Sequence, residues 1–293
     1  MSAPDLISIR DPHPRPLADL NWAARLEALR RDLSRHARVV VADSGGVDSA
    51  VVLRVAHEVL GERARAVIGR SDSYAAHELQ LALAQAAQFG AEVEIVTTGE
   101  LSNPVFASNP TDRCYHCKSE LYRQLDAVAV RFGADAVLDG TITDDLADWR
   151  PGRRAAAEHA VRSPLAELGF GKADVRAVAA HYGLASADKP ASPCLASRIP
   201  YGIAITQENL SQVERAEAIL RAAGFRELRV RHHGDVARIE VALAELPRLL
   251  QPDLRAQVLE DIRTLGYRFV AVDLAGFRSG NLNRGVVPEA MPR

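Results

Sequence analysis

The sequence predicts an α/β protein, with a doubly wound, mostly parallel sheet followed by a smaller C-terminal α+β domain. In the first half of the chain, four short apolar runs alternate with segments of helical period. This alternation is typical of parallel strands covered by helices on both faces. After Thr206 the pattern changes to one helix followed by two strand-like runs. Because 293 residues exceed one average domain, we predict a larger domain over residues 1–200 and a smaller one over 201–293.

The elements follow in order along the chain. A lead containing prolines precedes a helix at 17–36, and the strands of the larger domain are expected at 39–42, 64–68, 93–97 and 136–138. Helices are expected between them at 50–60, 75–89 and 119–132. Pro190, Pro193 and Pro200 then break the helical pattern. The smaller domain reads as a helix at 207–223, strands at 227–231 and 236–241, a helix ending near 265, and a strand at 268–274.

Composition narrows the class of protein. A formal net charge of -2 gives no whole-chain reason to expect a nucleic-acid partner. The N-terminus lacks a signal-peptide pattern, and no apolar stretch approaches the roughly 20 residues that span a bilayer. We therefore expect a cytoplasmic protein without a membrane partner. Three cysteines are an odd number in a reducing compartment, which argues against a disulfide framework and favours metal or redox chemistry.

One glycine-bearing turn is the strongest functional signal. It follows the first apolar run and consists of Ser44, Gly45, Gly46, Val47, Asp48 and Ser49. Two adjacent glycines let the backbone N–H groups approach an anion, and a helix N-terminus adds partial positive charge. Ser44 and Ser49 can donate to phosphate oxygens, and Asp48 can hold a magnesium ion bound to them. The P-loop spacing and its lysine are absent, and a serine-capped βα turn without a ligand is the alternative.

The turn also predicts the position of the active site. In open α/β sheets, ligands bind outside the carboxyl ends of the strands. The segments that follow the strands, at 69–73, 97–117 and 139–154, should therefore crowd the turn. Asp144, Asp145 and Asp148 follow the fourth strand and fall at the same edge.

The cysteines form the second signal. Cys114 and Cys117 are close enough in sequence to bind one metal centre or to form a redox pair, and Cys194 is the remaining cysteine. Three thiolates cannot complete a four-sulfur zinc site, although His116 could supply a fourth ligand. On a four-iron cluster, three thiolates leave one iron open for a substrate or a sulfide. Unrelated residues at a helix start, and an inert buried thiol at Cys194, are the alternatives.

Taken together, these segments resemble the LarE family of ATP-dependent sulfur transferases, which belongs to the PP-loop ATP pyrophosphatases. The resemblance covers the chain from about Asp32 to Asn283, and its segment PCLASRIPYG at 193–202 is more specific than the turn. Besides these two segments it is carried by residues 112–118, 144–145, 150–152, 163–165, 229–231, 240, 273–274 and 280–283.

The resemblance implies a particular reaction. Such enzymes use ATP and Mg2+ to adenylate a carboxylate of pyridinium-3,5-biscarboxylic acid mononucleotide, and sulfur then displaces AMP to leave a thiocarboxylate. Two rounds give the bis-thiocarboxylate that later binds nickel. A homo-oligomer, specifically a hexamer, is also implied. Sulfide or another donor would supply the sulfur, and the sequence does not identify which.

The cysteines select between two forms of the family. In the single-cysteine form, the residue at the position of Cys194 gives up its own sulfur and becomes dehydroalanine. In members that also carry the CxxC, three cysteines hold a 4Fe-4S cluster whose open iron can carry a sulfide. With Cys114, Cys117 and Cys194 all present, the chain resembles the cluster form.

The C-terminal domain supplies further candidates. Arg229 and Arg231 are two positions apart on a strand-like run, so both point to one face, and they match the phosphate-binding arginines of the family. Glu217, Glu240 and Asp273 are either an acidic metal or substrate site at a subunit contact, or ordinary surface carboxylates. We predict that His232 and His233 form a polar turn rather than a metal pair.

Two other functions remain open from the sequence. A PP-loop tRNA thiolation enzyme is disfavoured by the near-neutral charge, the lack of a second CxxC and the lack of an evident RNA-binding domain. The other is a non-catalytic nucleotide-binding module whose cysteines hold zinc.

Overall fold

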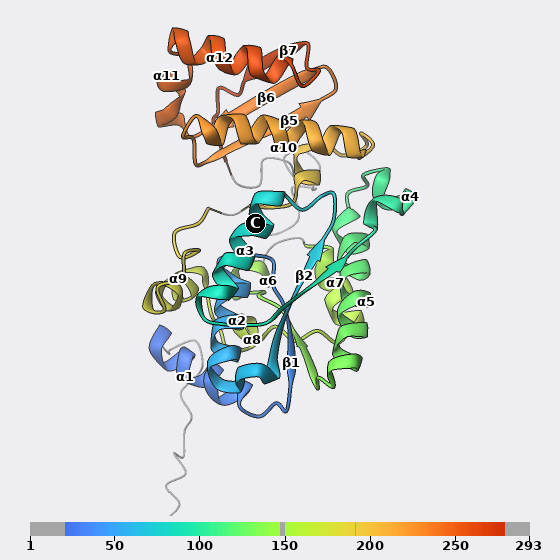
Figure 1. The fold of residues 1–293 in the computed structure, drawn as a ribbon, viewed down its shortest axis with the longest axis vertical. Coiled ribbons are helices and arrows are strands. Elements are labelled where there is room, and N and C mark those ends of the chain that lie inside the picture. Colours follow the sequence, from blue (N-terminus) through green and yellow to red (C-terminus); the bar gives the residue numbers. More distant parts are fainter. Residues whose placement is uncertain (1–20, 147–149, 191, 279–293) are drawn as a thin grey trace, which may run out of the picture.

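The computed structural model describes residues 21–146, 150–190 and 192–278, and it contains two sheets (Figure 1). The larger sheet has the order β3-β2-β1-β4 and the smaller has the order β5-β6-β7. The strands are β1 (Val39–Ala42), β2 (Ala64–Arg70), β3 (Val93–Thr97), β4 (Ala136–Leu138), β5 (Leu228–His233), β6 (Val236–Val241) and β7 (Phe269–Val272). The α/β class and the smaller C-terminal α+β unit are therefore confirmed.

Helices cover both faces of the larger sheet and pack against one face of the smaller sheet. They are α1 (Trp22–Leu33), α2 (Val47–Leu60), α3 (Ala76–Gln88), α4 (Pro104–Ala107), α5 (Arg113–Phe132), α6 (Thr143–Leu146), α7 (Gly152–Glu158), α8 (Pro164–Glu167), α9 (Lys172–His181), α10 (Gln207–Ala222), α11 (Leu246–Leu249) and α12 (Pro252–Arg263). Short 3-10 turns occur at Glu100–Ser102 and Leu195–Arg198, among other places.

The larger sheet is parallel and buried on both faces. In β1, Val39 and Val41 belong to the apolar core shared with α1, α2 and α9, whereas Val40 and Ala42 belong to the core shared with α5 and α7. Successive strand residues point to opposite faces, so an all-apolar strand suits this position. The chain winds outward from β1 to β3 and then crosses back to place β4 beside β1. The carboxyl end of β1 is thus the topological switch point.

The C-terminal unit has its own core. β5 and β6 are antiparallel, and β6 and β7 are parallel. α10 and α12 contribute apolar side chains to a core with these strands that includes Phe225, Val230, Ile239 and Ile262. The side of α10 near its start faces the ends of β2 and β3. The C-terminal unit therefore covers the edge at which the glycine turn lies.

Several element boundaries differ from the prediction. α1 is shorter than the predicted helix. It begins after Asn21, whose side chain accepts a hydrogen bond from the Ala24 N–H, and its C-cap residue is Ser34. α5 begins six residues earlier than expected, so both cysteines of the CxxC lie in its first turns. The helices between Thr143 and His181 are not among the predicted elements. Residues 17–20, Asp148 and residues 280–283, which the prediction also used, lie outside the described residues.

Within the ranges described, no helix combines the length and the apolarity needed to cross a bilayer.

Candidate active site

The glycine turn joins β1 to α2, and its backbone is built for close approach. Gly45 has φ +68°, a conformation that side chains other than glycine rarely adopt. A Cβ at this position would lie 3.0 Å from the Ala82 Cβ and 3.1 Å from the Tyr74 hydroxyl. Gly46 is the N-cap of α2 and has no side-chain cap bond. The first N–H groups of this 14-residue helix are thus directed at the loop.

Asp43 stabilises the turn through hydrogen bonds. Its buried carboxylate accepts hydrogen bonds from Gly45 N–H at 2.9 Å and from the Ser49 hydroxyl at 3.0 Å. Burial raises the pKa of Asp43, and these hydrogen bonds oppose that shift. Ser49 is buried in this network, whereas Ser44 is exposed. Of the two predicted phosphate donors, Ser44 is therefore the more accessible, and both assignments stay predictions.

Two lysines from distant segments meet the turn. Lys172, at the start of α9, places its ammonium 2.9 Å from both carboxylate oxygens of Asp48. Lys189 donates to the Gly45 carbonyl at 2.9 Å and pairs with Glu78. The prediction missed both lysines, which are 124 and 144 residues away from the loop residues that they contact.

Other carboxylates of the β4 edge gather at the same place. Asp144 accepts the Lys172 backbone N–H at 3.0 Å, and Asp145 pairs with Arg150 at 2.8 Å. Burial raises the pKa of Asp145, and the nearby charge of Asp48 adds to the shift. Carboxylate oxygens are the ligands that Mg2+ prefers, and the magnesium role of Asp48 stays a prediction.

The three cysteines converge from two segments. Cys117 and Cys194 both pack against an apolar cluster that includes Ala75, Phe106 and Leu195. The Leu195 N–H donates to the Ser73 carbonyl at 2.8 Å, which ties the Cys194 segment to the loop after β2. Burial raises the pKa of the Cys117 thiol, and the charges of Glu100 and Cys194 add to the shift. Partial desolvation also raises the pKa of Cys114, which lies at the surface, and the neighbouring Cys194 adds to that shift. All three cysteines are free thiols.

The thiols lie near one another without forming a closed ligand set. In the part of the chain that the structure describes, no group of three or more His, Cys, Asp or Glu side chains is placed to hold a metal ion. His116 is instead turned toward Asp112, at 3.9 Å, and stacks edge-on against Tyr115. One buried oxygen of Glu100 has no hydrogen-bond partner, and its other oxygen lies 3.9 Å from the Cys117 sulfur.

The arginines of β5 share one face, as predicted. Val230 between them points into the C-terminal core, whereas Arg231 donates to the Ser197 carbonyl at 2.8 Å and forms a two-pronged pair with Glu240. Arg229 is buried and packs on the Phe277 ring at 4.8 Å. Burial, aided by the charges of Arg198 and Arg231, lowers the pKa of Arg229 to about 10. The fold thus disfavours the charged form of Arg229, and the phosphate-binding role of both arginines stays a prediction.

The acidic candidates of the C-terminal unit are all paired with arginines. Glu217 is fully buried and binds Arg198 and Arg221, and it also accepts the Val230 N–H. Glu240 binds Arg231 and Arg238, and Asp273 binds Arg238. These carboxylates are thus neither surface groups nor a shared cluster, and a metal role for them stays a prediction.

The two histidines lie at the end of β5 rather than in the turn. The turn consists of Gly234 and Asp235, because Gly234 has φ +63°. His232 is 3.1 Å from the Tyr267 hydroxyl, and His233 accepts from Arg238. Their expected placement in the turn was therefore wrong.

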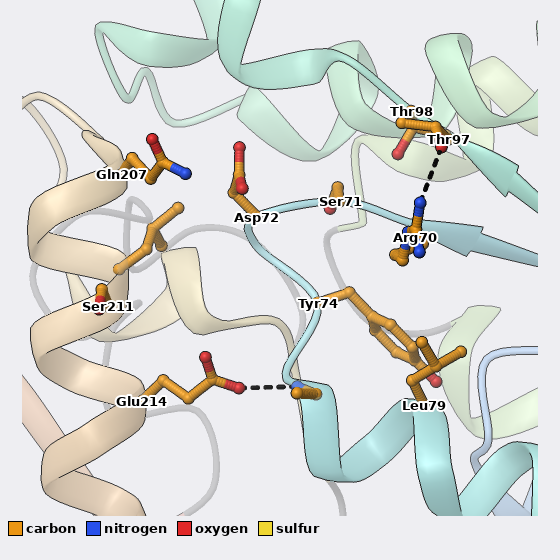
Figure 2. Close-up of a pocket in the computed structure, with 12 residues that line it drawn as sticks. Arg70, Ser71, Asp72, Tyr74, Leu79, Thr97, Thr98, Gln207, Ser211 and Glu214 are labelled. Atoms are coloured by element: carbon orange, nitrogen blue, oxygen red, sulfur yellow. Dashed lines mark hydrogen bonds between the residues drawn. The ribbon is translucent and has the colours of Figure 1, made fainter.

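A cavity of about 520 Å³ opens beside the glycine turn (Figure 2). It lies between the ends of β2 and β3 and the first turns of α10, and Tyr74 separates it from the turn, since its hydroxyl donates to the Ser44 carbonyl at 3.0 Å. The lining is mostly polar: Arg70, Ser71, Asp72, Tyr74, Ala76, Leu79, Thr97, Thr98, Gln207, Leu210, Ser211 and Glu214.

Comparison with known proteins agrees with this geometry. A family model described as NAD synthase matches residues 22–114, which include β1 and the glycine turn. Over 261 residues, the chain is 41% identical to the pyridinium-3,5-bisthiocarboxylic acid mononucleotide synthase of Lactiplantibacillus plantarum, and the match covers 89% of this chain and 93% of that protein. The chain belongs to the LarE family. Together with the NAD synthase match over the loop, this membership supports an ATP-using enzyme.

The family also includes proteins from distant organisms. The chain is 44% identical over 261 residues to an uncharacterized protein of Synechocystis sp., with 89% of this chain and 97% of that protein covered. It is 25% identical over 245 residues to an uncharacterized protein of Methanocaldococcus jannaschii, with 84% and 92% covered.

Proposed function

We propose that the chain is an ATP-dependent sulfur transferase acting on pyridinium-3,5-biscarboxylic acid mononucleotide. A substrate carboxylate attacks the α-phosphorus of ATP and pyrophosphate leaves; a sulfur nucleophile then attacks the acyl carbon and AMP leaves. The observation that carries the proposal is that the Cys194 segment is tied to the loop after β2, so that the cysteines and the glycine turn after β1 lie at the same edge of the sheet. The 41% identity to a named synthase supports the same substrate.

The chain's residues divide the work of the first step. The N-terminus of α2 and the loop N–H groups bind the departing phosphates, which lowers the barrier by stabilising developing negative charge. Asp48 and its neighbours would hold Mg2+, which when bound neutralises the same charge. The cavity between β2, β3 and α10, which shares Tyr74 with the surroundings of the turn, would take the nucleoside of ATP. Arg229 would bind the phosphate of the mononucleotide.

The three thiols suit a 4Fe-4S cluster, which would supply an iron position for a sulfide when bound. Two features support this assignment: Cys117 and Cys194 pack against the same apolar cluster, and Cys114 is near enough to Cys194 for their charges to interact. Their raised pKa values mean that Cys114 and Cys117 are protonated without metal at pH 7. Cluster loading must therefore release these protons.

Pyrophosphate release tests the enzyme. Protein purified without oxygen, given ATP, Mg2+ and the dicarboxylated mononucleotide, should release pyrophosphate only when all components are present. If no pyrophosphate forms, the chain is a nucleotide-binding module instead. Tight tRNA binding with a steep salt dependence would favour tRNA thiolation.

Iron and sulfide analysis tests the sulfur source. We expect about four of each per chain, and replacing any of the three cysteines by serine should abolish the visible absorption. A colourless protein that loses hydrogen sulfide from Cys194 on turnover would show the sacrificial route.

Arg229 provides a separate test of substrate binding. Arg229→Met removes a buried cation whose pKa is lowered in the fold, so the cation opposes folding at pH 7 and its loss should not lower the free energy of unfolding. Binding of the mononucleotide should weaken at least tenfold, since a charged hydrogen bond contributes about 1.5–3 kcal/mol. Calorimetric titration and urea unfolding measure the two effects. Unchanged mononucleotide affinity would remove Arg229 from the site.

A further inference from the structure

The cavity beside the glycine turn is lined by polar side chains that the fold itself does not use. Among the residues that the structure describes, Asp72, Gln207 and Ser211 line this cavity and have no side-chain hydrogen bond or ion pair. Figure 2 shows Asp72 and Gln207 extending into the space between the loop after β2 and α10. Polar groups that converge on a cavity without stabilising the fold are candidates for ligand binding.

The loop that carries Asp72 is fixed by hydrogen bonds on both sides of that residue. The Tyr74 N–H donates to the Ser71 carbonyl at 3.1 Å, which closes a turn with Asp72 at its second position. The hydroxyls of Ser71 and Ser73 lie 3.1 Å apart, and Ser73 also donates to Glu100 at 2.8 Å. Asp72 itself is exposed. Its carboxylate is therefore positioned by the loop but is free to contact a ligand.

One face of α10 forms the opposite wall, because side chains three and four positions apart lie on the same side of a helix. The residues of that face are Gln207, Leu210, Ser211 and Glu214. Glu214 accepts the Ala76 N–H at 2.7 Å, which fixes this helix beside the start of α3. The Gln207 amide and the Ser211 hydroxyl are therefore held at the cavity, where both can donate to a ligand.

The chemistry of this lining matches a ribose. An ionised carboxylate accepts hydrogen bonds and cannot donate them, so the ligand of Asp72 must supply O–H or N–H groups. The two neighbouring hydroxyls of a ribose can donate to both carboxylate oxygens, and a hydroxyl oxygen can also accept from an amide such as that of Gln207. In dinucleotide-binding α/β folds, a carboxylate about 20 residues after the glycine turn accepts the ribose 2′-hydroxyl. Asp72 has a comparable place, after β2, which pairs with β1.

We infer that Asp72 and Gln207 bind the ribose hydroxyls of ATP and make the site selective for ribonucleotides. The cavity adjoins the glycine turn through Tyr74, whose hydroxyl donates to the Ser44 carbonyl at 3.0 Å. A nucleotide whose phosphates lie on the turn can therefore place its ribose here. Because Gln207 belongs to the C-terminal unit, the bound nucleotide contacts both units. No covalent bond changes, and the inference rests on the proposed ATP-dependent function.

Binding measurements without turnover test the inference. The full chain, without the mononucleotide, is titrated by calorimetry with Mg2+ and α,β-methylene-ATP, and then with the 2′-deoxy form of this ATP analogue. Wild type should bind the ribose form about tenfold or more tightly than the 2′-deoxy form, because a hydrogen bond to a charged carboxylate is lost with the hydroxyl. In Asp72→Asn this preference should fall to about threefold, since only a neutral acceptor remains. The ratio of the two affinities is decisive, because removing an anion near a triphosphate raises both affinities alike.

Two further variants accompany this measurement. Gln207→Ala should lower the ratio by about threefold, because one neutral hydrogen bond to the ribose is lost. Asp235→Asn removes an equal charge from an exposed pair with Arg268 outside the cavity, so it should keep the wild-type ratio. The wild-type ratio and Gln207→Ala provide the same test if Asp72→Asn fails to fold.

Each outcome has a defined meaning. Equal binding of the two analogues by wild type, or a full preference in Asp72→Asn, would overturn the inference and leave the ATP-dependent function standing. The mononucleotide substrate also carries a ribose. If Asp72→Asn weakens binding of the mononucleotide and leaves the analogue ratio unchanged, the assignment to ATP is wrong. A wild-type chain that binds neither analogue would overturn the ATP-dependent function itself, and this inference with it.

Discussion

Single residues set the shape of the glycine turn, and the charged side chains around it come from several segments of the chain. The sequence marks Gly45 and Ser49 directly, since a turn of this kind needs a positive φ and small donors. It does not mark Lys189 or Glu78, whose pairing holds the Gly45 carbonyl away from the expected phosphates. A buried carboxylate paired with a buried lysine is costly to break. The turn is therefore sensitive to acid.

The pH dependence of unfolding should reveal this pair. Burial alone would raise the pKa of Glu78, but hydrogen bonds from His77 and Lys189 lower it from 4.5 to about 2. Because the folded pKa lies below the unfolded one, the stabilisation is complete above pH 4.5 and is lost as pH falls toward 2. The shift corresponds to about 3 kcal/mol at most. Measured by urea unfolding, the free energy of unfolding of Glu78→Gln should fall less over this pH interval than that of wild type. Equal losses would contradict the pairing.

At the scale of elements, the start of α5 and the Cys194 segment are joined by Asn109. This residue is fully buried and has φ +58°. Its amide donates to the carbonyls of Ile199, Pro200 and Ile203, and its carbonyl oxygen accepts from Arg113. Asparagine tolerates this backbone region better than most residues. One side chain thus aligns the helix of Cys114 and Cys117 with the segment that carries Cys194.

Replacing Asn109 should loosen this alignment. Asn109→Ala leaves several buried groups without partners and places alanine at a positive φ, so we expect a loss of about 2–4 kcal/mol. Hydrogen exchange should rise at residues 199–205. Asn109→Gly keeps the backbone relaxed and separates the two effects. Asn103→Ala, which removes only an exposed cap bond of α4, serves as the control, and equal effects of the two alanine variants would contradict the joining role.

At the scale of the whole molecule, the C-terminal unit completes the edge at which the turn lies. An apolar cluster combines Ala75 and Phe106 with Leu195, Ile205 and Val213, so it spans the predicted boundary near residue 200. Glu214 of α10 accepts the Ala76 N–H at 2.7 Å and caps α3, whose own N-cap residue is alanine (Figure 2). The C-terminal unit is thus fixed to the start of α3.

Glu214→Gln tests this contact. The variant weakens a charged cap at a helix N-terminus, so the free energy of unfolding should fall by about 1 kcal/mol. Affinity for the ATP analogue should fall as well, because Glu214 also lines the cavity. Glu208→Gln on the same helix is the matched control, since Glu208 lies outside that lining. Equal behaviour of the two variants in unfolding and in titration would contradict the capping role.

The sequence alone determined the strands, the glycine turn and the cysteines, because these depend on local periodicity and on residue types within a few positions. The bounds of β1, β3, β4 and β6 agree with the prediction. Only the tertiary structure decided which charges meet the turn and how Glu217, Glu240 and Asp273 are paired. Several of those partners are distant in sequence: 19 residues separate Arg198 from Glu217, 35 separate Arg238 from Asp273, and 124 separate Asp48 from Lys172. An ion pair depends on distance in space, which no local pattern records.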